Sequence, residues 1–523
     1  MNGIYVQTLS VPWLLLAVIT PFIVSILSPL LGRKLSSKKL ATINFAALLF
    51  SLVVIGYLSW ISFLNQKAYV DPTYFTHPVI GSWTMLLDPL SAPLAFSIAL
   101  VTCFIEIYSI PYMEHRVREM VEEEEVKPFS LGIYYMLYTM FAASMIGTVL
   151  ATNLIEFYLF FELTLLPSFL LIAFYGYGAR MRIAIMYLIW THVGALLLLL
   201  GCLATGFAAE TFDILNVNTL TFNVGLGEKV LLGSIAQAVA LVMVIGLFIK
   251  MAVFGVHIWL PYAHAEAPTP VSALLSPNLI GIGAYALIRI PYTLFPKTFS
   301  GMSIYMILLA VITMFYGGLM ALSQDDFKRF LAYSSISQMG YLLLGISSLN
   351  GTGITGAMLH YASHAVGKAI LFAVAGCIIV QLHGLRSISK MGGLGQKMPV
   401  TAALALIGFM HITGIPPSLG FWSEVLIFFG VAEKALAMGS IAFFLIVLAL
   451  LITIGLSTAY AFITMKRIFF GKTPSKLKDI ARDGSWYLLG PMIMVAVTGI
   501  LLFFYPTAFI DPLIKAIQFI YHI

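Results

Sequence analysis

The sequence predicts an all-α integral membrane protein of about fourteen transmembrane helices. Of the 523 residues, 60% are hydrophobic and only 10% are charged, whereas soluble proteins carry about 25% charged residues. Apolar runs long enough to cross about 30 Å of hydrocarbon as a helix recur along the whole chain. The polar gaps between them are short, the longest covering 64–89, 209–229 and 466–484, so we expect no soluble domain.

The apolar runs define the expected helices, and together they make residues 1–523 a single polytopic membrane domain. The first run has no basic leader and no small-residue cleavage site, so we expect it to be retained as a helix. The expected helices lie near 11–31, 41–63, 90–113, 130–151, 154–176, 183–208, 230–255, 268–291, 302–323, 330–349, 354–382, 399–431, 438–465 and 485–505. The twelfth and thirteenth runs are long enough to contain breaks.

The basic residues predict the orientation of the chain. Fourteen helices place both termini on one side of the membrane, and the loops on the opposite side then hold 20 of the 28 Lys and Arg residues. Basic residues gather on the cytoplasmic side of membrane proteins. We therefore expect both termini on the outer side of the membrane. The net charge of +6 orients the chain and requires no nucleic-acid partner.

Several kinds of chemistry lack their usual sequence patterns. Cys103, Cys202 and Cys377 all lie in apolar runs and form no paired motif, which argues against disulfides, iron–sulfur ligation and a redox centre in this chain. No Gly-rich phosphate loop followed by Lys and Ser or Thr is present, so direct use of ATP is not expected. We expect neither a cofactor nor a metal in this chain.

Two apolar segments are interrupted by glycine and proline. The first contains Lys250 and continues through Gly255 to Pro261, and the second runs from His411 through Pro416-Pro417 to Glu424. Both residue types break the backbone ladder, and the freed groups are tolerated only against protein or water. Paired broken helices indicate an ion site of a transporter. If 130–291 and 302–465 form inverted five-helix repeats, each break lies in the fourth helix of its repeat.

Glu162 and Lys250 are the first candidate ion-carrying pair. Glu162 lies in the apolar run 154–176, and Lys250 is the only charged residue of the run 230–255, where an unpaired lysine costs about 2.5–3.5 kcal/mol. An ion pair about 4 Å apart in a dielectric near 20 gains roughly 4 kcal/mol. Opening this pair would favour release of the lysine proton, which makes it a switch. The alternative is a static salt bridge that holds two helices together.

A stripe of ionisable residues marks the run 354–382. His360, His364 and Lys368 are spaced by four, which places them along one helix face. Histidine titrates near neutral pH, so the stripe suits proton relay, although hydrogen-bonded packing is the alternative. Two histidines four apart also suit a metal, but no carboxylate or cysteine joins them. The weaker candidates are His192, His257, His264 and His411.

Three long motifs carry a resemblance to a known family. They are Phe-Phe-Glu162-Leu followed by Pro167, the segment from Phe-Ile-Lys250 through His257-x-Trp-Leu-Pro-x-Ala-His264, and Asp326-x-Lys-Arg-x-Leu-Ala-Tyr-Ser-Ser-Ile-Ser-Gln-Met-Gly. The chain resembles the antiporter-like membrane subunits of respiratory complex I. That family is related to subunits of multi-subunit Na⁺/H⁺ antiporters and of membrane-bound hydrogenases.

The resemblance implies two inverted repeats with a half-channel in each and a polar axis between them. It implies Glu162 and Lys250 as the switch of the first half-channel and Glu424 as the terminal residue of the second. A glutamate at this last position resembles the pattern of the M-type subunit. A chain that ends soon after the fourteenth helix resembles that pattern too. It also implies partners: other membrane-arm subunits, and peripheral subunits that carry iron–sulfur clusters, flavin and a quinone site.

Two positions depart from the family pattern. Gly281 stands where the family often has a central lysine in the eighth helix. Lys368, by contrast, lies in a stretch similar to the L-type and antiporter subunits. We therefore expect His364 and Lys368 to take over the connection from Lys250 toward Glu424. This mixed pattern leaves the electron donor open.

Three functional hypotheses follow. The leading one is an ion-translocating subunit of an oxidoreductase similar to NADH:quinone oxidoreductase, driven by electron transfer in its partners. The second is a component of a gradient-driven Na⁺/H⁺ antiporter or of a membrane-bound hydrogenase. The third is a solute carrier or structural subunit in which the charges only join helices. Carboxylates and free carbonyls at the breaks suit H⁺ and Na⁺, so both ions stay open.

Overall fold

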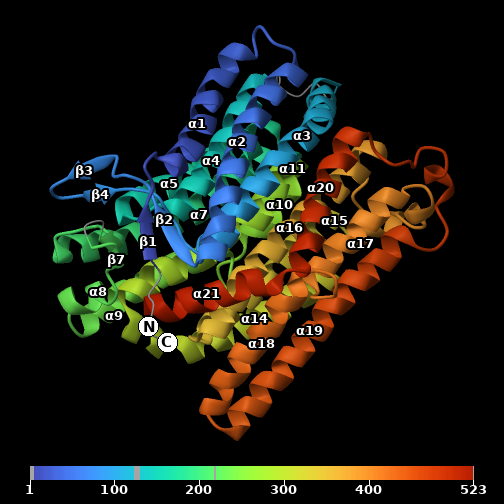
Figure 1. The fold of residues 1–523 in the computed structure, drawn as a ribbon. Coiled ribbons are helices and arrows are strands. Elements are labelled where there is room, and N and C mark those ends of the chain that lie inside the picture. Colours follow the sequence, from blue (N-terminus) through green and yellow to red (C-terminus); the bar gives the residue numbers. More distant parts are fainter. Residues whose placement is uncertain (1–4, 123–129, 217–218, 522–523) are drawn as a thin grey trace.

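The protein is a bundle of long helices packed side by side (Figure 1). The computed structural model describes residues 5–122, 130–216 and 219–521. Both ends of the described chain lie where the second helix finishes. Strand β1 pairs with the strand directly after that helix, and Lys515 near the C-terminus contacts Gln66 at 3.3 Å.

The first half of the chain contains helices α1 to α12. A cluster of short segments, including two π-helical turns η1 and η2, forms the eighth predicted span. The bounds are Trp13–Leu31 (α1), Ser37–Asn65 (α2), Ala92–Glu122 (α3), Leu131–Leu150 (α4), Leu154–Leu163 (α5), Leu165–Tyr175 (α6), Arg180–Ala209 (α7), Leu226–Val230 (α8), Ser234–Met251 (α9), Trp259–Glu266 (α10), Thr269–Leu274 (α11), Leu275–Leu279 (η1), Ile280–Leu287 (α12) and Ile288–Tyr292 (η2).

The second half contains helices α13 to α21 and three short 3₁₀ turns. The bounds are Pro296–Gly301 (α13), Ser303–Leu322 (α14), Phe327–Ser347 (α15), Gly351–Gln381 (α16), Ile388–Lys390 (η3), Leu394–Gln396 (η4), Pro399–Ile412 (α17), Leu419–Ala437 (α18), Ser440–Phe469 (α19), Ser475–Leu477 (η5), Trp486–Phe503 (α20) and Pro506–Tyr521 (α21).

The strands are short and belong to connections between helices. Tyr5–Thr8 (β1), Lys67–Val70 (β2) and Leu86–Leu87 (β5) form a sheet in the order β1-β2-β5, parallel between β1 and β2 and antiparallel between β2 and β5. Phe75–His77 (β3) pairs with Gly81–Trp83 (β4), and Leu215–Asn216 (β6) pairs with Thr221–Phe222 (β7), both antiparallel.

The predicted fold class is confirmed. Within the described parts of the chain, twelve helices are long and apolar enough to cross a membrane. The two remaining predicted spans are α15, whose Ser and Gln residues make it less apolar, and the pair α17 and α18. The break expected in one of the two long runs lies between Ile412 and Leu419, and the next run forms the continuous helix α19. The division into inverted repeats stays a prediction.

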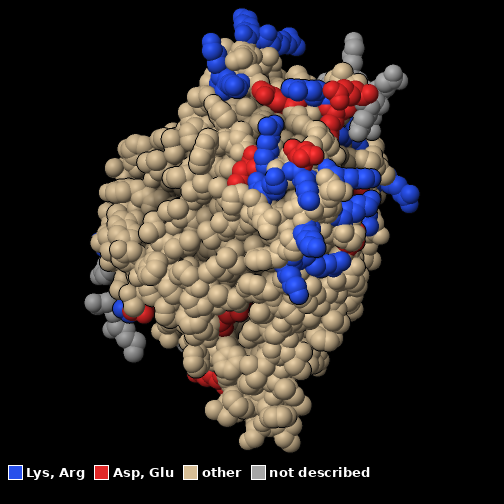
Figure 2. All heavy atoms as spheres, turned by 90° about the vertical axis from the view of Figure 1, so that its right-hand side faces the viewer, with Lys and Arg blue, Asp and Glu red and all other residues tan. Residues whose placement is uncertain are grey.

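Charged side chains gather toward one end of the molecule. Figure 2 shows Lys and Arg mostly on the upper part of the face in view, which is the end that carries the α1–α2 turn in Figure 1. That turn holds Arg33, Lys34, Lys38 and Lys39. The surface below it carries few charged side chains and consists of helix faces with many exposed large hydrophobic residues, as expected where lipid is the solvent.

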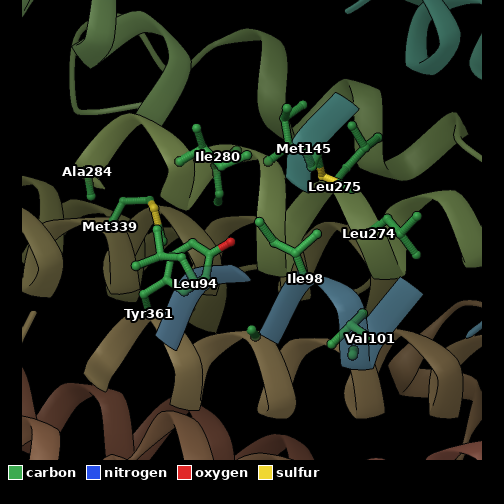
Figure 3. Packing of buried hydrophobic residues seen from close by; sticks show 14 of the residues in the cluster. Leu94, Ile98, Val101, Met145, Leu274, Leu275, Ile280, Ala284, Met339 and Tyr361 are labelled. Carbon is green, nitrogen blue, oxygen red and sulfur yellow. The ribbon is translucent and has the colours of Figure 1, made fainter. Parts of the chain in front are cut away.

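The core lies around the eighth predicted span and α16. Every residue in the most apolar window of Thr269–Tyr292 is buried, and 94% of the corresponding window of α16 is buried. Figure 3 shows Leu94 and Ile98 of α3, Ile280 of α12 and Tyr361 of α16 packed in this region. Residues far apart in the sequence therefore meet at the centre of the bundle.

A close contact between glycines joins α7 to α9. A Cβ added to Gly246 would lie 2.5 Å from the carbonyl oxygen of Gly194, and a Cβ added to Gly194 would lie 2.8 Å from that of Gly246. Small residues allow helix backbones to approach closely in membranes, where apolar burial alone gives little attraction between helices. This contact lies one turn before Lys250 and fixes that residue relative to α7.

Two buried carboxylates anchor helices at their ends. Asp71, which is 2% exposed, accepts hydrogen bonds from the backbone N–H groups of Leu14 (3.3 Å) and Leu15 (2.7 Å) at the start of α1. Asp88 binds the Nη2 atom of Arg289 through both oxygens at 2.7 and 2.8 Å. Arg289 Nε also donates to the Tyr285 hydroxyl at 2.8 Å.

We predict that Asp71→Ala lowers the unfolding free energy by about 1 kcal/mol, because the first N–H groups of α1 lose their acceptor. Asp71→Asn retains an oxygen acceptor and is the matched control. Thermal unfolding of the detergent-solubilised protein measures both. Equal melting temperatures for Asp71→Ala and the wild type would contradict the capping role.

Asp71 also predicts a pH dependence. Burial raises its pKa from 3.8 to about 6. The folded state therefore binds this proton more tightly than the unfolded state, and stability falls as pH rises from about 4 to about 6. We expect the wild type to lose stability relative to Asp71→Asn across this window in the same unfolding measurement. A constant difference would show that Asp71 does not titrate there.

Candidate ion-translocation site

Lys250 lies at the first broken helix. It is the second-to-last residue of α9 and is 2% exposed. The helix stops because Ala252 takes a left-handed conformation with φ of 53°. The indole N–H of Trp259 in α10 donates to the carbonyl of Ile249 at 3.0 Å and so satisfies one of the freed backbone groups.

The ammonium group of Lys250 is held by a hydroxyl and a ring. Its Nζ atom donates to Thr164 Oγ1 at 3.3 Å and lies 4.4 Å from the centre of the Phe161 ring. These two residues flank Glu162 at the end of α5. The lysine is therefore positioned by the segment that carries its predicted partner.

Glu162 does not form the direct pair with Lys250 that the sequence predicts. Its carboxylate instead contacts Nδ1 of His192 on α7. Among the described residues, no carboxylate lies within 4.0 Å of Lys250 Nζ. The reason is geometric: Glu162 lies on the outer side of α5, with 28% of its side chain exposed, whereas Lys250 is enclosed behind Phe161 and Thr164.

His192, a weaker candidate from the sequence, is the residue that Glu162 contacts in the structure. It lies next to the Gly194 contact between α7 and α9, and 45% of its side chain is exposed. The available signal was a histidine in the apolar run 183–208, which contains no Asp, Glu, Lys or Arg. Its proximity to Glu162 required the packing of α5 against α7.

The second candidate group lies on α16. His360, His364 and Lys368 are all 0% exposed. Lys368 donates from Nζ to Ser334 Oγ and to the Leu331 carbonyl at 3.0 Å. The structure thus places all three predicted residues inside the bundle, with Lys368 bound by α15 through neutral oxygens.

His360 connects this group to the second broken helix. Its Nδ1 atom lies 3.0 Å from Ser423 Oγ, and the Tyr341 ring lies alongside it with ring centres 5.2 Å apart. Ser423 directly precedes Glu424 in α18. The row Lys368, His364, His360 therefore leads along one helix face toward Glu424.

Glu424 lies against the interruption between α17 and α18. A Cβ added to Gly414 would lie 2.6 Å from Glu424 Oε2, and Gly414 has φ of 63°. This position therefore needs glycine both for its backbone conformation and for the space that the carboxylate occupies. The other predicted break thus also holds an ionisable side chain directly beside it.

Two of the weaker candidates are held by contacts beside the helix breaks. His257 accepts a hydrogen bond from the Gly255 N–H at 3.2 Å and packs against Tyr316, without contacting Lys250 in the described structure. His411 is joined to Ser363 through its ring nitrogen (3.0 Å) and its carbonyl (2.8 Å). Both arrangements stabilise the breaks.

Several buried polar atoms without a hydrogen-bond partner lie between the two breaks. Most buried polar groups in proteins have a protein or water partner. Among the described residues, the atoms without a partner include both ring nitrogens of His264 and His364, both amide atoms of Asn278, Nε2 of His360 and Oε1 of Glu424. In the described chain no group of three or more His, Cys, Asp or Glu side chains is arranged to bind a metal.

Comparison with known proteins identifies the family. Residues 151–453, more than half of the chain, match the family described as the NADH:quinone oxidoreductase/Mrp antiporter transmembrane family. The chain belongs to this family. Residues 79–119 also match the N-terminal family of chain 5 of complex I, NADH-ubiquinone oxidoreductase.

Relatives within the complex I/Mrp family define the subunit type. The NAD(P)H-quinone oxidoreductase chain 4-2 of Synechocystis sp. is 30% identical over 480 residues, which cover 90% of this chain and 80% of that protein. A chain of Thermus thermophilus respiratory complex I with bound NADH has 25% identity and a TM-score of 0.78, covering 97% of this chain and 99% of that one. The chain is an antiporter-like membrane subunit of the complex I chain 4 type.

The fold is shared more widely than complex I. A chain of the Mrp complex from Dietzia sp. has a TM-score of 0.82 at 20% identity, with 97% of both chains covered. At this low sequence identity, the structural likeness shows that the two chains share a fold and nothing more.

Gly281 shows how this chain accommodates the departure from the family pattern. A Cβ at this position would lie 2.4 Å from Cδ2 and Cε2 of Tyr361. The Tyr361 ring of α16 therefore fills the space of a side chain at 281, and its hydroxyl donates to the Asn278 carbonyl at 3.1 Å. Figure 3 shows Tyr361 packed near Ile280, Met339 and Leu94.

We predict that Gly281→Lys reduces the amount of assembled protein, because its Cβ overlaps the Tyr361 ring. The double variant Gly281→Lys with Tyr361→Ala removes the overlap and is expected to restore assembly. Size-exclusion chromatography of the tagged protein measures both. Normal assembly of the single variant would mean that the helices separate without cost at this contact.

Proposed function

We propose that this chain translocates protons in the membrane arm of an oxidoreductase similar to NADH:quinone oxidoreductase. Electron transfer in partner subunits supplies the energy. The observation that carries the proposal is the placement of Lys250 and Glu424 at two helix breaks, with a buried polar row on α16 leading to the second. The relatives named NAD(P)H-quinone oxidoreductase chain 4 support the redox coupling.

The first step uses exchange of partners at Glu162. In the described arrangement the carboxylate binds His192 while Lys250 binds neutral Thr164. Rotation of Glu162 toward Lys250 creates an ion pair worth roughly 4 kcal/mol at 4 Å in a dielectric near 20. Return of Glu162 to His192 removes that stabilisation, and Lys250 then passes its proton toward α16.

The second step uses the interior row. Asn278 and His364 supply polar atoms without protein partners between the two breaks. Lys368, His364 and His360 then carry the proton toward Glu424, from which it leaves. His257 belongs to the turn that shapes the first break. The proposed repeats 130–291 and 302–465 each contain one break and one half of this path.

A neighbouring membrane subunit covers the face of α5 and α7. His192 and Glu162 are 45% and 28% exposed within membrane-spanning helices. A charged side chain facing lipid costs about 2.5–3.5 kcal/mol, whereas a protein neighbour supplies polar partners. We infer that another membrane-arm subunit packs here and that peripheral subunits hold iron–sulfur clusters, flavin and the quinone site.

The charge distribution supports an orientation with both termini on the outer side. Lys and Arg gather at the α1–α2 end, opposite the end where β1 and α21 meet α2 (Figure 2). Basic residues stay on the cytoplasmic side. The membrane is accordingly an energy-transducing, cytoplasmic-type one.

A gradient-driven Na⁺/H⁺ exchanger is the second candidate, favoured by the fold shared with the Mrp complex. Purification of the tagged chain in mild detergent separates the two. Mass spectrometry and an iron assay are expected to find iron–sulfur subunits. Companions limited to other membrane antiporter subunits, with no iron, would support the exchanger and contradict the redox-driven pump.

We predict that Lys250→Ala and Glu162→Gln each reduce proton pumping by about 10²-fold or more, the range for losing a proton-transfer group. Assembly stays intact because neither residue forms a direct pair with the other in the described arrangement. A pH-sensitive dye reports pumping in liposomes that contain the purified complex and are energised with its electron donor.

Lys297→Ala and Glu210→Gln are the matched controls, because both residues are exposed and lie outside the path. We expect wild-type pumping from both. Full ion transport by Lys250→Ala or Glu162→Gln would rule out the proposed switch.

A further inference from the structure

A narrow apolar cleft lies apart from the ion site. Its volume is about 280 Å³, and it is enclosed by parts of α2, α3, α16, α18, α20 and α21. Its walls carry no charged side chain and include Trp60, Phe63, Phe96, Leu501 and Phe509. Three of its lining residues, Trp60, Leu501 and Tyr505, are 47%, 55% and 62% exposed, so the cleft opens on the apolar outer surface of the bundle.

The cleft occupies the half of the membrane on the side of the chain termini. It contacts α2 from Gly56 to Phe63, the last third of that helix, and α3 from its first residue, Ala92. Its deep end touches Ala362 and Leu419. These residues adjoin Ser363, which binds His411, and Gly420 beside the second break.

The lining selects the occupant, because the walls of the cleft offer almost no polar group to a ligand. A single hydrocarbon chain matches both the apolar walls and the opening toward lipid.

The junction of α2 and α21 adds a positive charge at the same end. Phe63 and Phe509 meet edge to face with ring centres 5.2 Å apart. Beyond them, exposed Lys515 contacts Gln66 at 3.3 Å, and it forms no ion pair with Asp511 in the described structure. An exposed ammonium group that is bound only to a neutral amide oxygen complements a lipid phosphate.

We propose that the cleft binds one acyl chain of an anionic phospholipid whose phosphate meets Lys515. The chain lies along α2 and α20 and ends beside the second helix break. There it covers the lipid-facing side of the segment that holds Glu424. Only this last consequence, a seal against ion leakage, rests on the proposed function; the binding site does not.

The test uses the purified complex in nanodiscs that contain phosphatidylglycerol with a photoreactive diazirine at the end of one acyl chain. After illumination, mass spectrometry locates the labelled peptides. We expect labelling to concentrate on the lining segments of α2, α3 and α20. Uniform labelling of all exposed helix faces would overturn the proposal, as would a partner subunit cross-linked inside the cleft.

Gly56→Leu fills the cleft without disturbing the packing behind it. A Cβ at Gly56 would lie 3.5 Å from Phe96 Cε2, an ordinary contact, and the rest of the side chain extends into the cleft. We expect it to reduce labelling of the lining about tenfold or more, because the acyl chain loses several buried methylene groups. Unchanged labelling would contradict the site.

Gly455→Leu on α19 is the matched control, because nothing lies within 4 Å of a Cβ there. We expect it to label like the wild type.

Thr498→Phe fills the cleft from α20 and is expected to repeat the effect if Gly56→Leu assembles poorly. Lys515→Ala is expected to reduce labelling by phosphatidylglycerol but not by a diacylglycerol with the same diazirine chain, because diacylglycerol has no phosphate; equal loss with both lipids would contradict the phosphate contact. Donor-driven proton pumping, measured separately, tests the function independently of the site.

Discussion

The structure depends on satisfying backbone groups where helices stop inside an apolar environment. At the first break, Trp259 binds the carbonyl of Ile249 and Thr313 Oγ1 accepts from the Phe254 N–H at 3.2 Å. At the second, Ser418 donates to the Met410 carbonyl at 3.0 Å. Each unsatisfied group would cost several kcal/mol in lipid. These bonds allow irregular backbone to exist beside Lys250 and Glu424.

Neutral oxygens bind the buried lysines, whereas the buried Arg289 is paired with Asp88. Lys250 binds a threonine hydroxyl, Lys368 binds a serine hydroxyl and a carbonyl, and Lys328 donates to the carbonyls of residues 265 and 267 at the end of α10. A buried ammonium bound only to neutral groups keeps much of its desolvation penalty. Its charge therefore responds strongly to a carboxylate that approaches or withdraws.

The spans and breaks could be predicted from the sequence because they follow from local composition. Apolar runs longer than a membrane crossing become helices, and Gly255 and Gly414 mark places where the ladder ends. The partner of Glu162 could not be predicted. Lys250 and His192 are both reachable in principle, and the choice depends on how α5 packs against α7 and on the side of α5 that the carboxylate occupies.

Contacts across the centre of the bundle could not be predicted from the sequence either. In the sequence, Gly281 stands where the family often has a lysine. In the structure, the ring of Tyr361, which follows 80 residues later, fills the space that a side chain at this position would need. The row on α16 was predictable because its spacing of four lies within one helix. Its link to Glu424 through Ser423 required the tertiary packing of α16 against α18.

The buried pair of Asp88 and Arg289 has a consequence for biogenesis. Its two members are 201 residues apart, and both side chains are almost fully enclosed. During synthesis, Asp88 enters at the start of α3 long before the ribosome has made the eighth span. Its carboxylate must remain at the membrane surface or bind a temporary partner until Arg289 arrives. The pair can therefore form only after the eighth span has been made.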